Sequence, residues 1–337
     1  MIGRGQGRLR VVLPWLEAAL GAATAEGRAP ARAPAAEWLV ARGRASPVSG
    51  PSWRDWLMAG TDEGADLLRR FPAGPCLRAL HAGQRPEGTW ACARPVHLLT
   101  AIDHLQLAPG GMDIGADESS ALLEDVNRHC QGRGLRFHAA GPTGDWQLEC
   151  ADPVDCGSVH PEDAAGRNLR ALMPDGRDRA RVCSLMNEIQ MLLHEHPVNL
   201  ERAARRLPAI NSLWLWGFGR LGAASAENLP TLYAEDAWLA GVWRLHGAAS
   251  RSLEEFAAAV PSIAGEVLVA WSRRLDGETD EALAEAERGL FAPARTALRS
   301  GAVHAVDMLL GGRAFETDRS ARVRFWRRGK PLAEALA

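Results

Sequence analysis

Apolar residues follow two kinds of pattern along this chain, and each kind predicts a different element. Short continuous apolar runs are typical of strands buried on both faces of a sheet. They occur at Leu9 to Leu13, Ser212 to Trp216, Glu266 to Trp271 and Val303 to Leu310. Apolar residues spaced three and four apart predict amphipathic helices. These are expected at Ala36 to Arg42, Trp53 to Met58, Asp117 to the glycines at 132 and 134, Arg179 to His194, Ala234 to Leu245 and Thr279 to Ser300.

Strands that alternate with helices indicate an α/β fold, with a mostly parallel sheet flanked by helices. One region departs from this order: after the helix from Asp117, residues 135–140 and 145–150 alternate like two strands joined by a turn. The sequence therefore predicts a small inserted α+β subdomain. The expected organisation is 1–110 as the N-terminal part of the α/β core, 111–165 as the insert and 166–337 as the remainder of the core.

A last strand is expected at Ala321 to Trp326, where basic and aromatic residues crowd together. Arginines that flank a strand discourage edge-to-edge pairing, and we take this as the first interpretation. The alternative is nucleic acid, bound by phosphate neutralisation and base stacking. The residues concerned are Arg322, Arg324, Phe325, Trp326, Arg327 and Arg328.

Composition narrows the class of protein. The 337 residues are 47% hydrophobic and 24% charged, with a formal net charge of −2, so nothing in the overall charge points to nucleic acid or to an anionic membrane. No apolar run reaches the length of about 18 residues that a membrane span needs. The six cysteines show no CxxC spacing, which favours reduced thiols. We expect a soluble cytoplasmic protein, with no membrane partner and with nucleic acid as an unlikely one.

Candidate chemistry concentrates between Met186 and Gly219. Pro197 ends a helix, and Asn199 is expected to N-cap the next one. A helix N-terminus and the forked guanidinium of Arg202 suit a phosphate or a carboxylate. The alternative is an ordinary cap beside a solvated arginine.

The strand from Ser212 ends in Gly217-Phe218-Gly219. Ligand sites of α/β folds lie at the carboxyl ends of strands, although a single GxG is equally typical of a tight turn. Asn211 would orient a ligand or cap that turn. His194 and His196 are two residues apart and so lie on different helix faces; we expect local hydrogen bonding there, and no metal.

The segment resembles part of the archaeal-type cofactor-independent phosphoglycerate mutases, which belong to the alkaline phosphatase superfamily. The matching positions are His196, Pro197, Val198, Asn199, Arg202, Pro208, Ala209, Asn211, Trp214, Trp216, Gly217 and Gly219. The resemblance covers residues 95–245, and the C-terminal part more weakly. It implies an alkaline-phosphatase-like core and a ligand-binding cleft formed by Asn199, Arg202, Asn211, Trp216, Gly217 and Gly219. Two further segments, at 90–107 and 325–332, resemble bacterial regulatory proteins of the xanthomonad pathogenicity-factor type, which are related to these mutases.

The resemblance also implies chemistry that this sequence lacks. The mutases hold two divalent metals with Asp and His ligands, beside a Ser nucleophile. At the corresponding places this chain reads LPWLE, AWSRRLDGETD, DMLLGGRAF and RVRFWRRG. We therefore expect no catalytic residues, no metal and no cofactor: a degenerate, non-catalytic regulatory or ligand-sensing protein that binds a phosphorylated or carboxylated metabolite.

Two alternatives stay open at this point. The first is an active mutase or phosphatase whose ligands lie elsewhere in the chain. The second is a scaffold that binds a protein partner through exposed tryptophans such as Trp53, Trp56 or Trp238.

Overall fold

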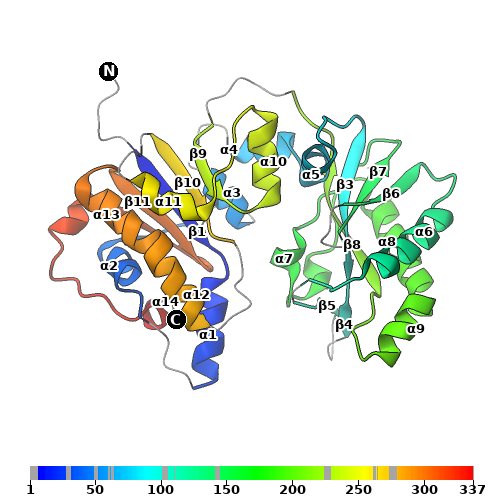
Figure 1. The fold of residues 1–337 in the computed structure, drawn as a ribbon, viewed down its shortest axis with the longest axis horizontal. Helices are drawn as coiled ribbons and strands as arrows, with labels where there is room; N and C mark the ends of the chain where they lie inside the picture. The colour runs from blue at the N-terminus through cyan, green and yellow to red at the C-terminus, as the bar shows by residue number, and fades with distance from the viewer. Residues whose placement is uncertain are drawn as a thin grey trace. The chain divides into compact units, whose positions relative to one another are not determined.

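The chain folds into two compact units in the computed structural model (Figure 1). The first unit is Met1–Ala65 with Ser225–Ala337, and the second is Asp66–Ala224. The residues that the structure describes are 7–27, 32–48, 52–59, 61, 64–100, 105–109, 111–140, 145–223, 229–260, 263, 265–272 and 279–336. The expected α/β class, with a largely parallel sheet flanked by helices, is confirmed.

The first unit contains a six-stranded sheet in the order β2-β12-β11-β1-β10-β9. From β11 to β9 the strands run parallel, whereas β12 and β2 are antiparallel additions at one edge. Central strand β1 places Val11 opposite both Val269 and Met308. The strands are β1 (Arg8–Leu13), β2 (Arg44–Ser46), β9 (Thr231–Ala234), β10 (Glu266–Ala270), β11 (Ala305–Leu310) and β12 (Arg313–Asp318).

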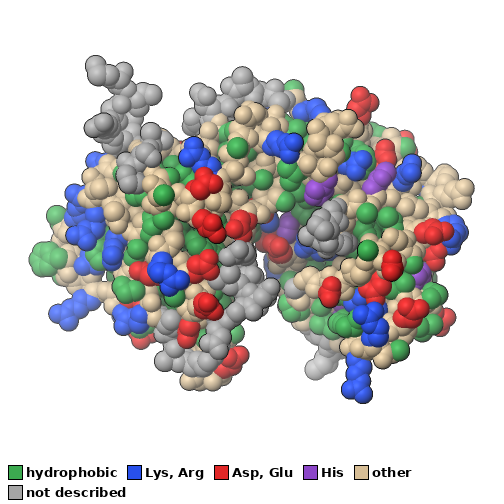
Figure 2. Space-filling model, viewed as in Figure 1, with side chains coloured by type: hydrophobic (Ala, Val, Ile, Leu, Met, Phe, Trp, Pro, Cys, Tyr) green, Lys and Arg blue, Asp and Glu red, His purple; other side chains and the backbone are tan. Residues whose placement is uncertain are grey.

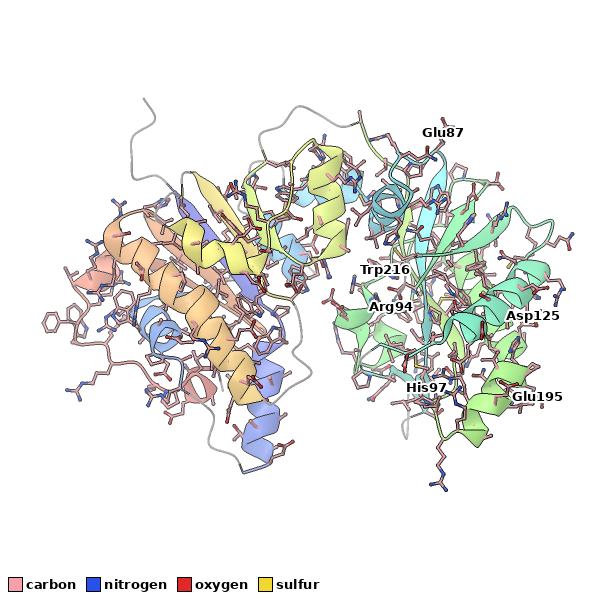
Figure 3. All side chains as sticks on the ribbon, viewed as in Figure 1. Glu87, Arg94, His97, Asp125, Glu195 and Trp216 are labelled. Atoms are coloured by element: carbon pink, nitrogen blue, oxygen red, sulfur yellow. The ribbon has the colours of Figure 1, made fainter. Side chains whose placement is uncertain are left out.

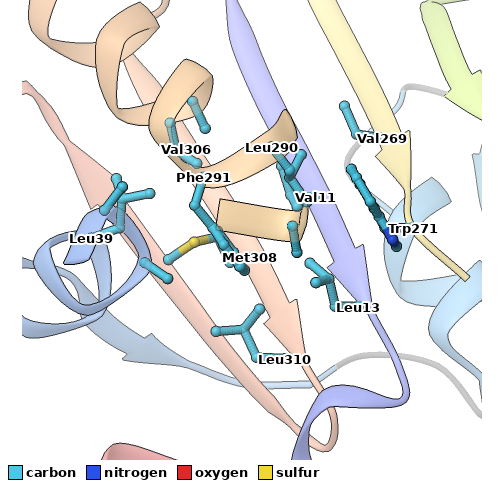
Figure 4. Close-up of a cluster of buried hydrophobic side chains, with 14 of the residues drawn as sticks. Val11, Leu13, Leu39, Val269, Trp271, Leu290, Phe291, Val306, Met308 and Leu310 are labelled. Atoms are coloured by element: carbon cyan, nitrogen blue, oxygen red, sulfur yellow. The ribbon is translucent and has the colours of Figure 1, made fainter. Parts of the chain in front are cut away.

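Strands β1, β10 and β11 are buried at almost every position, which is why their sequences are continuous apolar runs. On one face Val11, Leu13 and Met308 pack with Leu39 and Phe291 (Figure 4). The helices of this unit are α1 (Leu16–Ala25), α2 (Pro34–Arg42), α3 (Trp53–Met58), α10 (Ala237–Leu245), α11 (Leu253–Ala259), α12 (Thr279–Ala286), a π-helical turn (Glu287–Phe291), α13 (Ala292–Ser300), the 3₁₀ helix η4 (Arg319–Arg322) and α14 (Leu332–Leu336).

In this unit one sequence prediction started a helix three residues too early, and another, of a strand, was wrong. The helix expected from Ala234 begins at Ala237, because Ala234 ends β9 and the Asp236 carboxylate caps the helix by accepting the Leu239 N–H at 2.8 Å. The strand expected at Ala321 to Trp326 is instead η4 followed by turns. The chain leaves the sheet at Asp318, whose carboxylate accepts the Ser320 N–H at 2.8 Å and starts the 3₁₀ helix.

The second unit contains a four-stranded antiparallel sheet in the order β6-β7-β3-β8. Asn127 ties α6 to this sheet, since its side chain accepts the Phe137 N–H at 2.7 Å and donates to the Phe137 carbonyl at 2.9 Å. The strands are β3 (Thr89–Val96), β6 (Leu135–Ala139), β7 (Trp146–Cys150) and β8 (Ser212–Gly219), with a separate hairpin of β4 (Leu98–Thr100) and β5 (Leu105–Leu107).

Helices cover this antiparallel sheet, and α8 has the bounds expected from its amphipathic spacing. The helices are α5 (Ala73–Ala82), α6 (Ala116–His129), α7 (Pro161–Ala164), the 3₁₀ turn η1 (Leu169–Ala171), α8 (Arg179–His194) and α9 (Pro197–Ala204). Helix α4 (Gly64–Arg70) spans the division between the two units.

The second unit is larger than the expected insert of residues 111–165. That insert supplies α6, β6 and β7, and the two strands pair as the alternation predicts. However, β3 pairs with β7 on one side and β8 pairs with β3 on the other. Backbone hydrogen bonds therefore draw the segments before and after the insert into the same unit, which runs from Asp66 to Ala224.

Candidate functional site

Asn199 is buried and uses its amide group within the second unit. Its Nδ2 donates to the carbonyls of Leu193 and Ile210 at 2.7 and 2.8 Å, and its Oδ1 accepts the Ile210 N–H at 2.8 Å. It does not N-cap α9, because Pro197 occupies the first helical position and His196 is the cap, with Nδ1 accepting the Val198 N–H. Asn199 therefore joins the end of α8 to the chain that enters β8.

Arg202 is also internal, with 2% of its residue surface exposed. Its Nε donates to the Pro208 carbonyl at 2.8 Å, and its Nη1 donates to the Asp113 carbonyl at 3.0 Å and to Glu118 Oε2 at 2.7 Å. Glu118 in turn accepts the Gly115 N–H at the start of α6. The guanidinium thus holds α9 and α6 together.

Asn211 makes a two-way link to the residue that begins β4. Its Oδ1 accepts the Leu98 N–H at 2.7 Å, and its Nδ2 donates to the Leu98 carbonyl at 3.0 Å. Trp216 is buried, with its ring 4.2 Å from the His160 ring in an edge-on arrangement. Both side chains fasten loops onto β8.

Gly217 and Gly219 lie inside β8 and not beyond its end, so the expected turn is absent from this place. They are glycines because α5 approaches closely: a Cβ on Gly217 would lie 2.7 Å from Ala73 Cβ, and one on Gly219 would lie 2.5 Å from Pro72 Cγ. Gly217 also has φ +65°, which disfavours any residue with a Cβ.

The six candidate residues therefore do not form one cleft. Asn199, Arg202 and Asn211 gather around the loop before β8. Gly217 lies six strand residues beyond Asn211, roughly 20 Å away at about 3.3 Å per residue. His97, at the Asn211 end of the paired strands β3 and β8, and Trp216 lie well apart in Figure 3.

Of the histidines at 194 and 196, His196 has one hydrogen-bond partner that the sequence predicts and one that it does not. The expected local hydrogen bonding of His196 is confirmed by its contact with the Val198 N–H. Its other ring nitrogen, Nε2, lies 3.0 Å from Asp125 Oδ2 on α6. No local signal marks that second partner, because Asp125 is 71 residues away in the sequence.

The carboxyl ends of parallel strands are where an α/β sheet places its chemistry. In the first unit Pro14 and Trp15 follow β1, and Trp271 follows β10. Trp15 Nε1 donates to the Trp271 carbonyl at 3.0 Å, so the two strand ends are tied to each other. Beyond β11, Gly312 donates its N–H at 2.7 Å to the carboxylate of Glu17, which thus has a structural partner.

These residues do not fit a pair of divalent metals. Such a site needs several carboxylate or imidazole donors that converge on each ion. Across the described ranges, no three His, Cys, Asp or Glu side chains are grouped so that they could hold a metal ion. Asp307, in β11, is engaged by Arg8 through two hydrogen bonds of 2.6 and 2.9 Å. This carboxylate raises the pKa of Arg8, and burial lowers the pKa of the neighbouring Arg10.

A cavity of about 250 Å³ lies in the first unit at the carboxyl ends of β9 and β10. Glu235 follows β9 directly and Trp271 follows β10. The other lining residues come from α11, α12 and the π-helical turn: Leu253, Glu254, Glu285, Arg288 and Gly289. Three carboxylates and one guanidinium give the lining a formal charge of −2. Trp271 is buried, and its Nε1 has no hydrogen-bond partner among the described residues.

Comparison with known proteins relates the sequence to one group of enzymes. The chain is 26% identical over 206 residues to the 2,3-bisphosphoglycerate-independent phosphoglycerate mutase of Methanosarcina mazei, covering 56% of this chain and 49% of that enzyme. It is 36% identical over 62 residues to a probable mutase of the same kind from Geobacter sulfurreducens, covering 18% of this chain and 16% of that protein. The chain is thus distantly related to these mutases, and the match spans about half the length of the first and less of the second. No family model matches the chain.

Two solved structures align with nearly the whole chain. One is a cofactor-independent phosphoglycerate mutase from Thermoplasma acidophilum, with a TM-score of 0.47, 16% identity and coverage of 98% of this chain and 94% of that one. The other is a protein from Pyrococcus horikoshii, with a TM-score of 0.48, 13% identity and coverage of 99% and 92%.

No helix in the described ranges is both long and apolar enough to cross a membrane.

Proposed function

We propose that this protein is a non-catalytic regulatory or ligand-sensing protein on a phosphoglycerate-mutase-like scaffold. The observation that carries the proposal is the make-up of the strand ends in the first unit. Pro14 and Trp15 follow β1, Trp271 follows β10 and Gly312 lies beyond β11; none of these four has a carboxylate or imidazole, and the carboxylate of nearby Glu17 accepts a backbone N–H. Phosphoryl transfer by two metals depends on those ligands, whereas ligand binding does not.

The proposed binding site is the cavity at the carboxyl ends of β9 and β10. A phosphorylated or carboxylated ligand was expected from Asn199 and Arg202, but their side chains bond within the second unit. In the cavity an anion would meet three carboxylates. The indole of Trp271 and the formal charge of −2 favour a small molecule with an amino or guanidino group, because carboxylates and an aromatic ring both attract cations.

A coupled mutase assay tests the non-catalytic part of the proposal. Purified full-length chain is supplied with 3-phosphoglycerate and with manganese or magnesium, and the Methanosarcina mazei enzyme serves as the positive control. We expect no turnover from protein whose circular dichroism spectrum shows that it is folded. Turnover above about 1 per second, within the ordinary range of enzymes, would overturn the proposal.

Calorimetric titration tests the ligand class, with putrescine as the cationic probe and 3-phosphoglycerate as the anionic one. We expect saturable binding of putrescine, weakened about tenfold by Glu254→Gln, because the charged partner of an amine is lost. Glu255→Gln is the matched control: it lies next to Glu254 on α11, is exposed and does not line the cavity. Saturable binding of 3-phosphoglycerate alone, or equal effects of the two substitutions, would contradict the cationic assignment.

A further inference from the structure

The basic-aromatic loop, which we define as residues 319–330, takes no part in the cavity described above. Its sequence is RSARVRFWRRGK, which contains six basic residues and no acidic one. The whole chain has a formal net charge of −2, so this density of positive charge is local. In Figure 2 blue side chains gather over the part of the first unit where Figure 1 draws the red C-terminal segment.

Three apolar side chains of the loop are exposed to solvent. Val323, Phe325 and Trp326 have 64%, 77% and 65% of their surface exposed. The two aromatic rings stand edge to face, with centroids 5.4 Å apart. Single exposed apolar residues are common, but three within four positions form a patch that marks an interaction site.

The loop is held firmly against the first unit. Arg322 Nη2 donates to the Leu298 carbonyl at 3.1 Å, and Arg327 Nη1 donates to the Gly43 carbonyl at 3.1 Å. Backbone hydrogen bonds from Val323 to Ser320 and from Arg327 to Arg324, each of 3.1 Å, close successive turns. The fold of the first unit therefore fixes Phe325 and Trp326 in their exposed positions.

We propose that this loop docks the protein on an anionic lipid surface. Val323, Phe325 and Trp326 enter the boundary between headgroups and acyl chains, where an amphipathic indole is well accommodated. The surrounding arginines and Lys330 lie at the level of the lipid phosphates and are attracted by the negative surface potential. Net charge alone suggested no membrane partner, because it averages this cluster with the acidic surface elsewhere.

The geometry favours lipid over single-stranded nucleic acid. Proteins that bind single strands use a basic groove that follows the phosphate backbone, with aromatic rings as its floor. Here more than 60% of the surface of each of the two neighbouring aromatic residues is exposed, and their rings stand edge to face. They therefore do not form the flat floor of a groove. Arg322 and Arg327 each donate to a backbone carbonyl. Their guanidinium groups are therefore better suited to attracting a negatively charged surface at a distance than to forming two-pronged hydrogen bonds with single phosphates or carboxylates.

Vesicle co-sedimentation of the full-length chain tests this inference. Vesicles of phosphatidylcholine alone are compared with vesicles of equal parts phosphatidylcholine and phosphatidylglycerol. We expect binding to the anionic vesicles only, and weaker binding near 1 M salt, where screening shortens the range of the field to about 3 Å. Equal binding to both kinds of vesicle, or to neither, would overturn the proposal.

Two loop variants separate the apolar and the charged contributions. Phe325→Ala/Trp326→Ala should weaken binding more than about tenfold, because two aromatic side chains no longer leave water. Arg328→Gln/Lys330→Gln should weaken it about 25-fold, at about fivefold for each basic residue. The control is Met191→Ala/Leu200→Ala, which removes two exposed apolar side chains from the second unit and should change nothing. All three variants replace exposed residues, so unchanged circular dichroism confirms their fold.

Parallel measurements test two other binding partners of the loop, nucleic acid and a second copy of the chain. Fluorescence anisotropy with a labelled oligothymidylate reports nucleic acid, and light scattering across a range of concentrations reports self-association. If the oligonucleotide competes with vesicles and loses affinity in the same loop variants, the loop is a nucleic-acid site and the lipid assignment fails. If Phe325→Ala/Trp326→Ala instead abolishes a dimer, the patch is an interface between copies of the chain.

Discussion

The two units use their polar side chains for different purposes. In the second unit Asn199 and Arg202, two of the residues that the sequence marks as ligand-binding, are buried and bonded to backbone groups. In the first unit, strands β9 and β10 end at a cavity lined by Glu254 and by Trp271, whose Nε1 has no hydrogen-bond partner in the part of the chain that the structure describes. The unit with the recognisable motif thus uses it for internal bonding, whereas the cavity lies in a region without any motif.

The contrast teaches that residue type alone does not distinguish a structural link from a ligand site. An asparagine or arginine suited to holding a phosphate is equally suited to holding two carbonyl groups. What separates the two roles is the supply of internal partners. The Asn211 amide bonds to both the N–H and the carbonyl of Leu98, so its oxygen and nitrogen each have a backbone partner.

The largest expected effect tests whether Arg202 is structural. Arg202→Met should lower the free energy of unfolding by about 3 kcal/mol, because the Glu118 carboxylate loses its buried partner and the Pro208 carbonyl loses its donor. Urea denaturation measures the loss, and hydrogen exchange should show it in the second unit.

Arg205→Met is the matched control for that prediction. Arg205 approaches the same Glu118 at 3.4 Å, but 64% of its side chain is exposed. We expect a loss below about 1 kcal/mol. Equal losses from the two substitutions would mean that burial does not strengthen the bond between Arg202 and Glu118. The proposed difference between bonded polar residues in the second unit and the cavity in the first unit would then lose its support.

An effect of similar size is expected at Gly217. Gly217→Ala places a Cβ at φ +65° and 2.7 Å from Ala73, so left-handed strain and crowding both act, and we expect a loss of roughly 3 kcal/mol. Gly132→Ala has φ +76° but nothing within 4 Å of the added carbon, and should cost roughly 1 kcal/mol. Thermal melts of both variants provide the comparison; equal losses would show that α5 does not press on β8.

Much of the fold could be predicted from the sequence, because its strongest signals are local. The continuous apolar runs of β1, β10 and β11 and the helical spacing of α8 are readable without tertiary information. Strand β12 was not readable, since its sequence RAFETD gains its pattern only by pairing with β11 and β2. The segment after it was mistaken for a strand, because arginines and aromatics alternate there without any partner strand.

The candidate site was less predictable, because its determinants are separated along the chain. Arg202 and Glu118 are 84 residues apart, and nothing in either neighbourhood identifies the other. Glu287 belongs to an acidic helical stretch that has no local sign of a partner, yet its carboxylate accepts the N–H groups of Ala35 and Ala36 at the start of α2. Trp53 and Trp56, which the alternative of a protein-binding scaffold would need to be exposed, are buried. These outcomes depend on which elements pack together.

The smallest effect tests the surface of the second unit through pH. Glu188 accepts hydrogen bonds from Arg133, His129 and Ser184, and these partners, with Arg133 foremost, lower the pKa of Glu188 to about 2. An unfolded glutamate titrates near about 4.3, so the stabilisation is present above that pH and is lost as the pH falls toward about 2. We expect the melting temperature of Glu188→Gln to lie below that of the original chain at neutral pH, and the gap to close between about pH 4 and pH 2. Arg133→Gln should raise the pKa of Glu188 toward its ordinary value in a carbon-13 NMR titration. If the difference in melting temperature stays unchanged down to pH 2, the hydrogen bonds of Glu188 contribute no pH dependence to stability. The contact between α6 and α8 at Glu188 would then depend on packing, as contacts do in the interior of the same unit.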